Sequence, residues 1–262
     1  MSYVCIGAPY WIGERQSVSA VEAIKHSGIA ESIGAEWVDI QPDYAAYPDH
    51  VVAVNVALAN AIKAHEGKTP LIFAGDCVFA LGALKGLEAH DPAILWYDAH
   101  GDFNTPETSP SDFLGGMPLA AIVGRGNEAL MAGVGLSPLA ENDVVITDAR
   151  DLDPEEAEAL RSSALTHLEN IDDLLTVPLP QKPLYVHFDT DVVRLSDMPA
   201  MNYPSVGGPS LAQTIATLER VTHEAQVAGI LFSSWNQTLE GADLALDSTL
   251  KVVRAFVAEN AK

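Results

Sequence analysis

The sequence predicts an α/β fold in which helices cover both faces of a parallel β-sheet. Short apolar runs alternate with longer segments of helical periodicity along the chain. The runs are almost continuously apolar, which is typical of strands buried on both faces of a parallel sheet. Acidic residues follow directly after two of the runs. Open α/β sheets bind their ligands at the carboxyl ends of the strands, so the acids mark the expected functional edge.

The predicted elements follow one another in a regular order. The strands are expected at residues 3–8, 36–40, 71–74, 93–97, 143–147, 183–188 and 229–233. The helices are expected at residues 18–26, 51–66, 78–88, 118–124, a segment opening at 153, 210–226 and 242–259. Two long irregular stretches, 103–116 and 196–208, are expected to be functional loops. Because the sequence contains no repeat and no linker, we expect one domain over residues 1–262.

Local signals set the boundaries of several elements. Pro9 ends the first strand, and Gly75 ends the strand at 71–74. Residues 51–66 are rich in Ala, which favours a long helix. Asp153 is a good N-cap and Pro154 suits the first helical position, so together they mark the start of a helix.

The composition narrows the class of protein. The chain has 262 residues and a formal net charge of −22, from 36 acidic residues against 14 Lys and Arg. Such a surface repels nucleic acid and anionic membranes and attracts cationic small molecules. Two cysteines, Cys5 and Cys77, make no disulfide framework, and no apolar run has membrane-spanning length. We therefore expect a soluble cytoplasmic protein that acts on a small molecule, with no nucleic-acid or membrane partner.

Two strand ends carry side chains that can bind metal. The run at 93–97 is followed by Asp98, His100 and Asp102, which lie at i, i+2 and i+4 and share one face in an extended chain. The run at 183–188 is followed by Asp189 and Asp191. These donors exceed what one divalent ion needs and suit two hard or borderline ions that share carboxylates. The simpler alternative is that these residues are ordinary loop acids of an acidic protein. The same acidic pattern at two separate strand ends favours the metal site over this alternative.

Several motifs resemble those of the ureohydrolase (arginase and agmatinase) family. Residues 98–102 (Asp-Ala-His-Gly-Asp) resemble its DAHxD motif, and residues 188–191 (Phe-Asp-Thr-Asp) its SFDxD motif. Residues 74–77 (Ala-Gly-Asp-Cys) stand where the family has GGDH. Residues 104–106 match its substrate loop, and 150–154 its RDxDP motif. The resemblance implies a three-layer α/β/α sandwich with an eight-stranded parallel sheet, two Mn²⁺ ions, and a homo-oligomer (trimer or hexamer).

The resemblance also implies roles for single residues. The implied metal ligands are Cys77, Asp98, His100, Asp102, Asp189 and Asp191. Asp98 and Asp189 would bridge the two ions. His100 and Asp191 would complete one metal position, and Asp102 the other. Asp102 is also the implied catalytic residue, which would pass a proton to the leaving nitrogen after activated water attacks the trigonal carbon.

Four further residues match substrate-binding positions of arginase-like members. Asn104 and Ser111 would hold the carboxylate of an amino-acid substrate, and Asp153 and Glu156 would reach its α-amino group. The last pair has an alternative explanation. Asp153 and Glu156 stand at N-cap and N3 of a predicted helix, and a capping box of this kind needs no substrate.

The chain departs from the family pattern at three positions. Cys77 replaces the first metal-binding His, and a thiolate weakens a manganese position or biases it toward zinc. Gly115 stands where arginases carry a proton-shuttle His. Ser234 replaces the Glu that binds the guanidinium group. A subgroup that hydrolyses Nω-hydroxy-L-arginine also has Cys at position 77 and shares the sequence of residues 101–108 and 114–117, but it does not share the change at position 234.

The favoured function is a metal-dependent hydrolase. It would cleave a linear, non-peptide C–N bond in an amidine or modified guanidine, similar to Nω-hydroxy-L-arginine, with an amino-acid-like head. An N-hydroxyguanidine is less basic than a guanidine and depends less on the carboxylate that Ser234 replaces. The alternative is a non-catalytic or divergent metal-binding member that does not act on guanidines. A third hypothesis is a zinc deacylase, but the acid-rich pattern with two metal positions argues against it.

Overall fold

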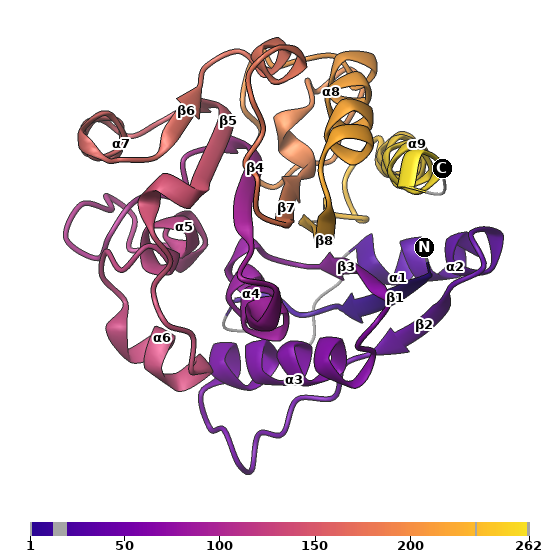
Figure 1. The fold of residues 1–262 in the computed structure, drawn as a ribbon, viewed down its shortest axis with the longest axis horizontal. Helices are drawn as coiled ribbons and strands as arrows, with labels where there is room; N and C mark the ends of the chain where they lie inside the picture. Colours follow the sequence, from indigo (N-terminus) through magenta and orange to yellow (C-terminus); the bar gives the residue numbers. More distant parts are fainter. Residues whose placement is uncertain (1, 13–19, 234, 261–262) are drawn as a thin grey trace.

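The computed structural model describes residues 2–12, 20–233 and 235–260. These residues form one eight-stranded sheet in which every neighbouring pair is parallel, in the order β2-β1-β3-β8-β7-β4-β5-β6 (Figure 1). The strands are β1 (Tyr3–Ala8), β2 (Glu36–Asp39), β3 (Thr69–Ala74), β4 (Ala93–His100), β5 (Val144–Asp151), β6 (Thr166–Leu168), β7 (Leu184–Asp189) and β8 (Val227–Ser233).

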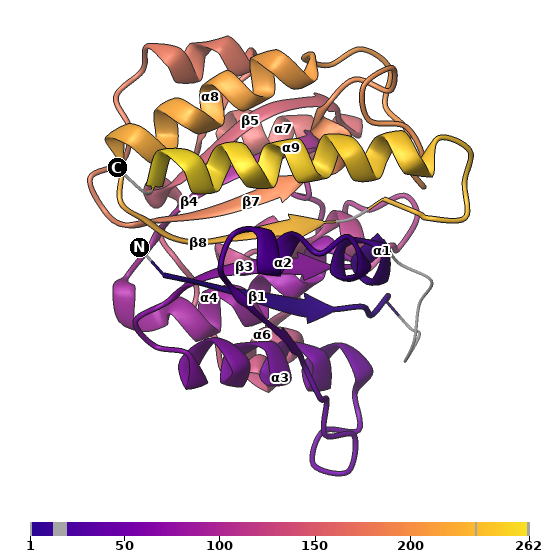
Figure 2. The ribbon, with the colours of Figure 1, turned by 90° about the vertical axis from the view of Figure 1, so that its right-hand side faces the viewer.

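Helices cover both faces of the sheet, as Figures 1 and 2 show. One face carries α3 (His50–Ala64), α4 (Ala80–Leu87), α5 (Pro118–Ile122), α6 (Glu128–Val134) and α7 (Pro154–Ser162). The other face carries α1 (Ala20–His26), α2 (Ile29–Ser32), α8 (Leu211–Glu224) and α9 (Ala242–Asn260). The predicted α/β sandwich with a parallel sheet is therefore confirmed.

The two faces have separate hydrophobic cores. In the central strand β4, Ile94 and Trp96 pack into the core under α3 and α4, whereas Leu95 and Tyr97 pack into the core under α8 and α9. All four side chains are buried. A strand of this kind needs apolar residues at every position, which explains why the strand runs of the sequence lack apolar–polar alternation.

Among the described residues, one β-strand and two α-helices were not predicted from the sequence. The edge strand β6 has only three residues and includes His167, so it forms no apolar run. The helices α2 and α6 have four and seven residues, too few for a clear helical period. The strand β5 also runs beyond its predicted end at Thr147 as far as Asp151, with positive φ angles at Asp148 and Ala149.

The strand order places the functional edge of the sheet. β3, β8, β7 and β4 are successive neighbours, so the residues after these strands meet although they are far apart in the sequence. Cys77 follows β3, Ser233 ends β8, Asp189 ends β7, and Asp98 lies near the end of β4. The parallel arrangement brings all four to the same edge, where α/β sheets bind their ligands.

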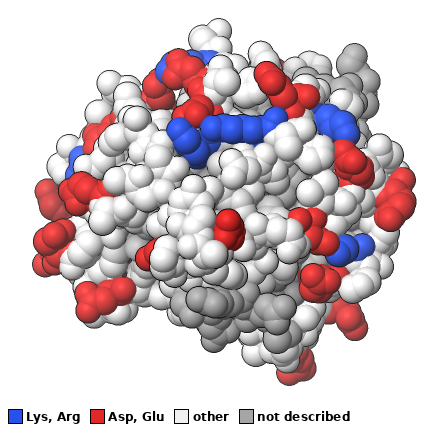
Figure 3. Space-filling view, turned by 90° about the horizontal axis from the view of Figure 1, so that it is seen from below, with Lys and Arg blue, Asp and Glu red and all other residues white. Residues whose placement is uncertain are grey.

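The surface is acidic, as the net charge of −22 requires. On the face in Figure 3, acidic side chains are spread widely and the basic ones gather mainly in one band. This face therefore lacks the broad basic surface that a nucleic acid would contact. Among the described residues, no helix has the length and apolar character needed to cross a membrane.

The helices α3 and α4 approach closely at Gly82. Its backbone N–H donates to Oδ1 of Asn55 at 2.6 Å, and Asn55 Nδ2 donates to the carbonyl of Val51 at 2.9 Å. A Cβ atom at position 82 would lie 2.4 Å from the carbonyl oxygen of Asn55. Because that neighbour is backbone, only separation of the two helices could accommodate a side chain.

We expect Gly82→Ala to lower the free energy of unfolding by about 2 kcal/mol or more, because overpacking at a close helix contact typically costs about 1–3 kcal/mol. Urea unfolding followed by circular dichroism measures the change. Lys63→Ala on the exposed side of α3, which removes only an exposed ion pair with Glu88, is the control and should cost less than about 1 kcal/mol. Equal stability of Gly82→Ala and the parent protein would contradict the close contact.

Candidate metal centre

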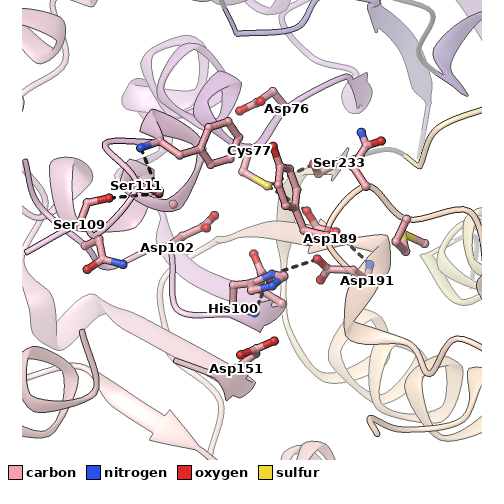
Figure 4. A pocket seen from close by; sticks show the side chains of 18 of the residues that line it. Asp76, Cys77, His100, Asp102, Ser109, Ser111, Asp151, Asp189, Asp191 and Ser233 are labelled. Atoms are coloured by element: carbon pink, nitrogen blue, oxygen red, sulfur yellow. Dashed lines mark hydrogen bonds and ion pairs between the residues drawn. The ribbon is translucent and has the colours of Figure 1, made fainter. Parts of the chain in front are cut away.

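A cavity of about 490 Å³ opens at the carboxyl ends of the strands. Figure 4 shows acidic side chains from different strands turned into it, together with His100 and Cys77. All the predicted metal ligands line this cavity: Cys77, Asp98, His100, Asp102, Asp189 and Asp191. The structure therefore brings together every metal ligand that the resemblance implied.

His100 joins the two acidic strand ends. Its Nδ1 atom lies 3.0 Å from Oδ2 of Asp191 and 3.5 Å from Oδ1 of Asp98. The backbone N–H of Ala99 donates to the other oxygen of Asp191 at 3.1 Å, which ties the end of β7 to the end of β4. One ligand atom from each of Asp98, His100 and Asp191 lies within 4.8 Å of the others, so these three side chains can share one cation.

Cys77 and Asp189 meet on the other side of the centre. The Cys77 thiol lies 2.9 Å from Oδ2 of Asp189 and 3.1 Å from Oγ of Ser233. Burial, and then the charge of Asp189, raise the pKa of this thiol well above its ordinary value. Cys77 thus lies in a group of side chains that could hold a metal ion, and a bound cation would favour its thiolate form.

Asp102 does not continue the extended chain of β4. The strand ends at His100, and Asp102 has a φ of 49°, in the left-handed region that Asp tolerates better than most residues. The expected extended geometry is therefore not followed, although the side chain still reaches the cavity. Its Oδ2 atom is buried and has no hydrogen-bond partner. Burial, and then the charge of Asp98, raise its pKa well above the ordinary range.

The electrostatics of the cavity favour a bound cation. Burial raises the pKa of Asp189 to about 7, and the neighbouring Asp191 charge adds to this effect. Burial also disfavours a charged His100, but hydrogen bonds to Asp191 and Asp98 outweigh it and raise the pKa of the imidazole to about 12. Clustered, buried carboxylates of this kind repel one another until protons or cations neutralise them. The unpartnered Asp102 oxygen and the oxygen-rich donor set fit divalent metal ions.

One residue near the centre was missed in the sequence. His187 on β7 is completely buried, and one of its ring nitrogens lies within 4.8 Å of ligand atoms of Cys77, Asp98 and Asp189. Burial lowers its pKa to about 3, so its imidazole is neutral. Because it stands inside an apolar strand, nothing in its local sequence separates it from a packed core residue.

The predicted head-group residues line the same cavity. Asn104 Nδ2 donates to Oδ2 of Asp153 at 3.0 Å, and Asn104 Oδ1 accepts from the Thr108 hydroxyl at 3.0 Å. Ser111 lies in the loop 103–116, where its Oγ accepts from the backbone N–H of Phe113 at 3.3 Å. These contacts hold Asn104 and Asp153 side by side on the cavity wall.

Glu156 has a clear structural role. Its two carboxylate oxygens accept from the backbone N–H groups of Phe103, at 2.8 Å, and Asp153, at 3.2 Å. The second contact belongs to the capping box that opens α7. Burial raises the pKa of Glu156 to about 7. The carboxylate therefore fixes the loop after β4 to the start of α7, and its predicted contact with substrate remains a prediction.

The wall at Gly115 is apolar. A Cβ atom there would lie 2.4 Å from the ring of Phe113, so this ring fills the space that a side chain at position 115 would take. The ring of Phe113 also contacts that of Tyr203 from the loop 196–208, with 5.1 Å between the centroids. Ser234, the predicted substrate-binding residue after β8, lies outside the described residues.

Arg150 positions the segment that carries Asp191. Its guanidinium group donates to the carbonyls of Asp191 and Val192, both at 3.0 Å, and pairs with Asp148 at 2.5 Å. Its Nε atom donates to the carbonyl of Val206 at 3.2 Å. One side chain therefore fixes the end of β7 and the following loop against β5, which holds that side of the centre in place.

Comparisons with known proteins agree with this geometry. The model of the family described as "Arginase family" matches residues 35–232. The chain is 30% identical over 223 residues to an arginase from Bacillus subtilis (strain 168), covering 79% of this chain and 75% of the relative. It is 35% identical over 212 residues to an arginase from Brevibacillus brevis, covering 74% and 71%. A crystal structure of arginase from Bacillus subtilis superposes with a TM-score of 0.84 at 28% identity, covering 98% of both chains.

The matched region includes the whole acidic centre, from Asp98 to Asp191. It extends over well more than half of the sequence, and the structural similarity extends over nearly all of it. The chain therefore belongs to the arginase family and is a hydrolase of that family.

Proposed function

We propose that the protein is a metal-dependent amidinohydrolase that cleaves a C–N bond in a guanidino compound with an amino-acid head. One observation carries this proposal. The acidic centre around Asp98 and Asp189 and the head-group residues Asn104, Ser111 and Asp153 line a single cavity. A substrate with a planar C–N group at one end and an amino acid at the other fits both sets at once.

The centre would hold two divalent ions: Mn²⁺ at one position, and Mn²⁺ or another divalent metal at the position near Cys77. Asp98 and Asp189 would be shared between them, His100 and Asp191 would complete one position, and Asp102 the other. Two divalent ions in such a site activate water and stabilise charge that develops on the substrate. The buried Asp102 carboxylate, with one unpartnered oxygen, is suited to accept a proton in the cavity and pass it to the leaving nitrogen.

The head of the substrate would bind on the wall formed by Asn104 and Asp153. These side chains are held together at 3.0 Å, so an amide donor and a carboxylate face the cavity in a fixed arrangement. Ser111, in the exposed part of the loop, would add a hydroxyl donor for the substrate carboxylate. Glu156 supports this wall through the start of α7, so its main effect would be on positioning.

We propose a less basic guanidine, such as Nω-hydroxy-L-arginine, as the preferred substrate. Ser234 lacks the carboxylate that would bind a guanidinium cation. Phe113 fills the space beside Gly115, so the wall offers an apolar ring in place of a proton-shuttle His. A cationic substrate group loses the most binding energy through these two changes, and a neutral or weakly basic group loses the least. Our favoured assignment is the Nω-hydroxy-L-arginine subgroup, because it also has Cys at position 77 and shares residues 101–108 and 114–117, although it keeps the Glu that Ser234 replaces.

The non-catalytic alternative is not favoured. Family membership points to an enzyme. The acidic centre supports bound cations, because clustered acids without them destabilise the fold. We further propose that the protein is a cytoplasmic homo-oligomer.

The Asp189 carboxyl should contribute a loss of stability to the metal-free protein as the pH rises from about 4 to 7. The raised pKa of Asp189, about 7, means that the folded state binds more protons than the unfolded state in this window, so stability falls with pH. Asp189→Asn should therefore raise the melting temperature of the metal-free protein at pH 7.5. The same variant should lose the stabilisation by Mn²⁺, about 2.7 kcal/mol at one hundred times the Kd.

Thermal melts with EDTA or with Mn²⁺ measure both effects. Asp151→Asn is the matched control, because Asp151 lines the cavity but is not among the side chains that could hold a metal ion. It should keep the stabilisation by Mn²⁺. A parent protein whose melting temperature does not respond to Mn²⁺ would contradict the metal centre.

Kinetics on three substrates test the substrate preference. The parent protein should hydrolyse Nω-hydroxy-L-arginine better than L-arginine and agmatine. Losing one charge-assisted contact costs about 1.5–3 kcal/mol, or roughly one to two decades in affinity, so Ser234→Glu should recover part of that loss for L-arginine. Thr238→Glu adds the same charge at an exposed position and should leave kcat/KM unchanged for all three substrates. Efficient hydrolysis of L-arginine by the parent protein would contradict the role given to Ser234.

A further inference from the structure

A second set of potential ligands overlaps the first. The first set is Asp98, His100 and Asp191, and the second is Cys77, Asp98, His187 and Asp189. In the second set, one ligand atom from each residue lies within 4.8 Å of the others. Asp98 belongs to both sets. Two cations could therefore bind next to each other, one of them against the buried His187.

His187 is poorly explained as a core residue. Its Nε2 atom is buried and has no hydrogen-bond partner, and its Nδ1 atom lies 3.4 Å from the Tyr185 hydroxyl. A buried polar atom without a partner costs about 1–3 kcal/mol. The ring is stacked on Trp96 with 3.6 Å between the centroids and 11° between the planes, which fixes its orientation. A metal ion would satisfy the imidazole that the protein leaves unsatisfied.

The second set also has a distinctive chemistry. A thiolate, an imidazole and two carboxylates are the ligands of four-coordinate zinc sites, whereas manganese prefers oxygen-rich sets. The Cys77 thiol is already 2.9 Å from the carboxylate of Asp189, so both donors meet at one point. The set at Asp98, His100 and Asp191 has no sulfur and suits manganese better. The two positions therefore differ in the metal that they favour.

We propose that His187 is a metal ligand and that, with Cys77, Asp98 and Asp189, it forms a zinc-preferring position in the centre. In this arrangement the buried His187 of β7 supplies the imidazole that is absent from position 77. Mn²⁺ or a similar ion would occupy the neighbouring position at His100 and Asp191. The inference rests on the proposed metal centre and adds a ligand and a metal preference to it.

Metal binding to the full chain tests this proposal without measuring activity. The metal-free protein is titrated with Zn²⁺ and with Co²⁺, whose absorption spectrum reports thiolate ligation and four-coordination. We expect one tightly bound Zn²⁺ per chain and a thiolate-to-cobalt charge-transfer band. Cys77→Ser should remove that band, and Cys5→Ser, which changes the other free cysteine, should keep it.

The variants His187→Phe and His187→Gln test the new ligand. Phe keeps an aromatic ring against Trp96, and Gln keeps a polar group, so at least one should fold, as circular dichroism can show. Substitutions beyond the direct ligands already weaken metal binding about 10–100-fold, so loss of the ligand itself should weaken Zn²⁺ binding at least about 100-fold. Mn²⁺ binding at the other position should change less than about threefold.

The outcomes separate this inference from the proposed function. Unchanged Zn²⁺ affinity and an unchanged Co²⁺ spectrum in a folded His187 variant would overturn the inference while leaving the hydrolase intact. Tight Zn²⁺ binding that depends on His187, in a protein without hydrolytic activity, would support the inference and contradict the proposed function. A parent protein that binds none of the three metals would overturn both.

Discussion

Mutual repulsion among buried carboxylates is the constraint on which the rest of this structure depends. Asp98 is 1% exposed and Asp102 is 4% exposed, and both face the same cavity as Asp189 and Asp191. The arrangement persists because the surrounding structure holds it in place. Arg150 fixes the end of β7, backbone N–H groups hold Asp98 and Asp191, and the strand order keeps the strand ends together. A bound cation would relieve this repulsion, which would couple the stability of the protein to its chemistry.

The sequence predicted the parts of the site that depend on periodicity. Asp98 and Asp189 follow apolar runs, and parallel strands bring such ends together, so their convergence required no knowledge of the strand order. The fold class followed from the same runs. By contrast, β6 is an edge strand of three residues, and a short edge strand carries too little apolar sequence to be recognised.

Other features depend on contacts between distant residues and could not be predicted. Asp102 has a φ in the left-handed region, so the extended chain expected there does not continue. His187 looks like one more buried strand residue until Cys77, more than one hundred residues away in the chain, is placed beside it. The ring of Phe113 occupies the space beside Gly115, and this depends on the conformation of the irregular stretch 103–116, which has no periodicity to predict it. The capping box of Asp153 and Glu156 was expected from the sequence, but the bond from Phe103 to Glu156 was not.

The contact between Phe113 and Tyr203 has a consequence for exchange with solvent. The two rings come from separate loops, and Tyr203 is 53% exposed, so the pair lies at the rim of the cavity. An aromatic pair contributes only about 0.5–1.5 kcal/mol beyond the area that it buries, so thermal motion separates such rings often. Part of the rim is therefore held by a contact between two loops that is weak beside the packing of the hydrophobic cores. The size of the opening depends on this contact as well as on the cavity wall.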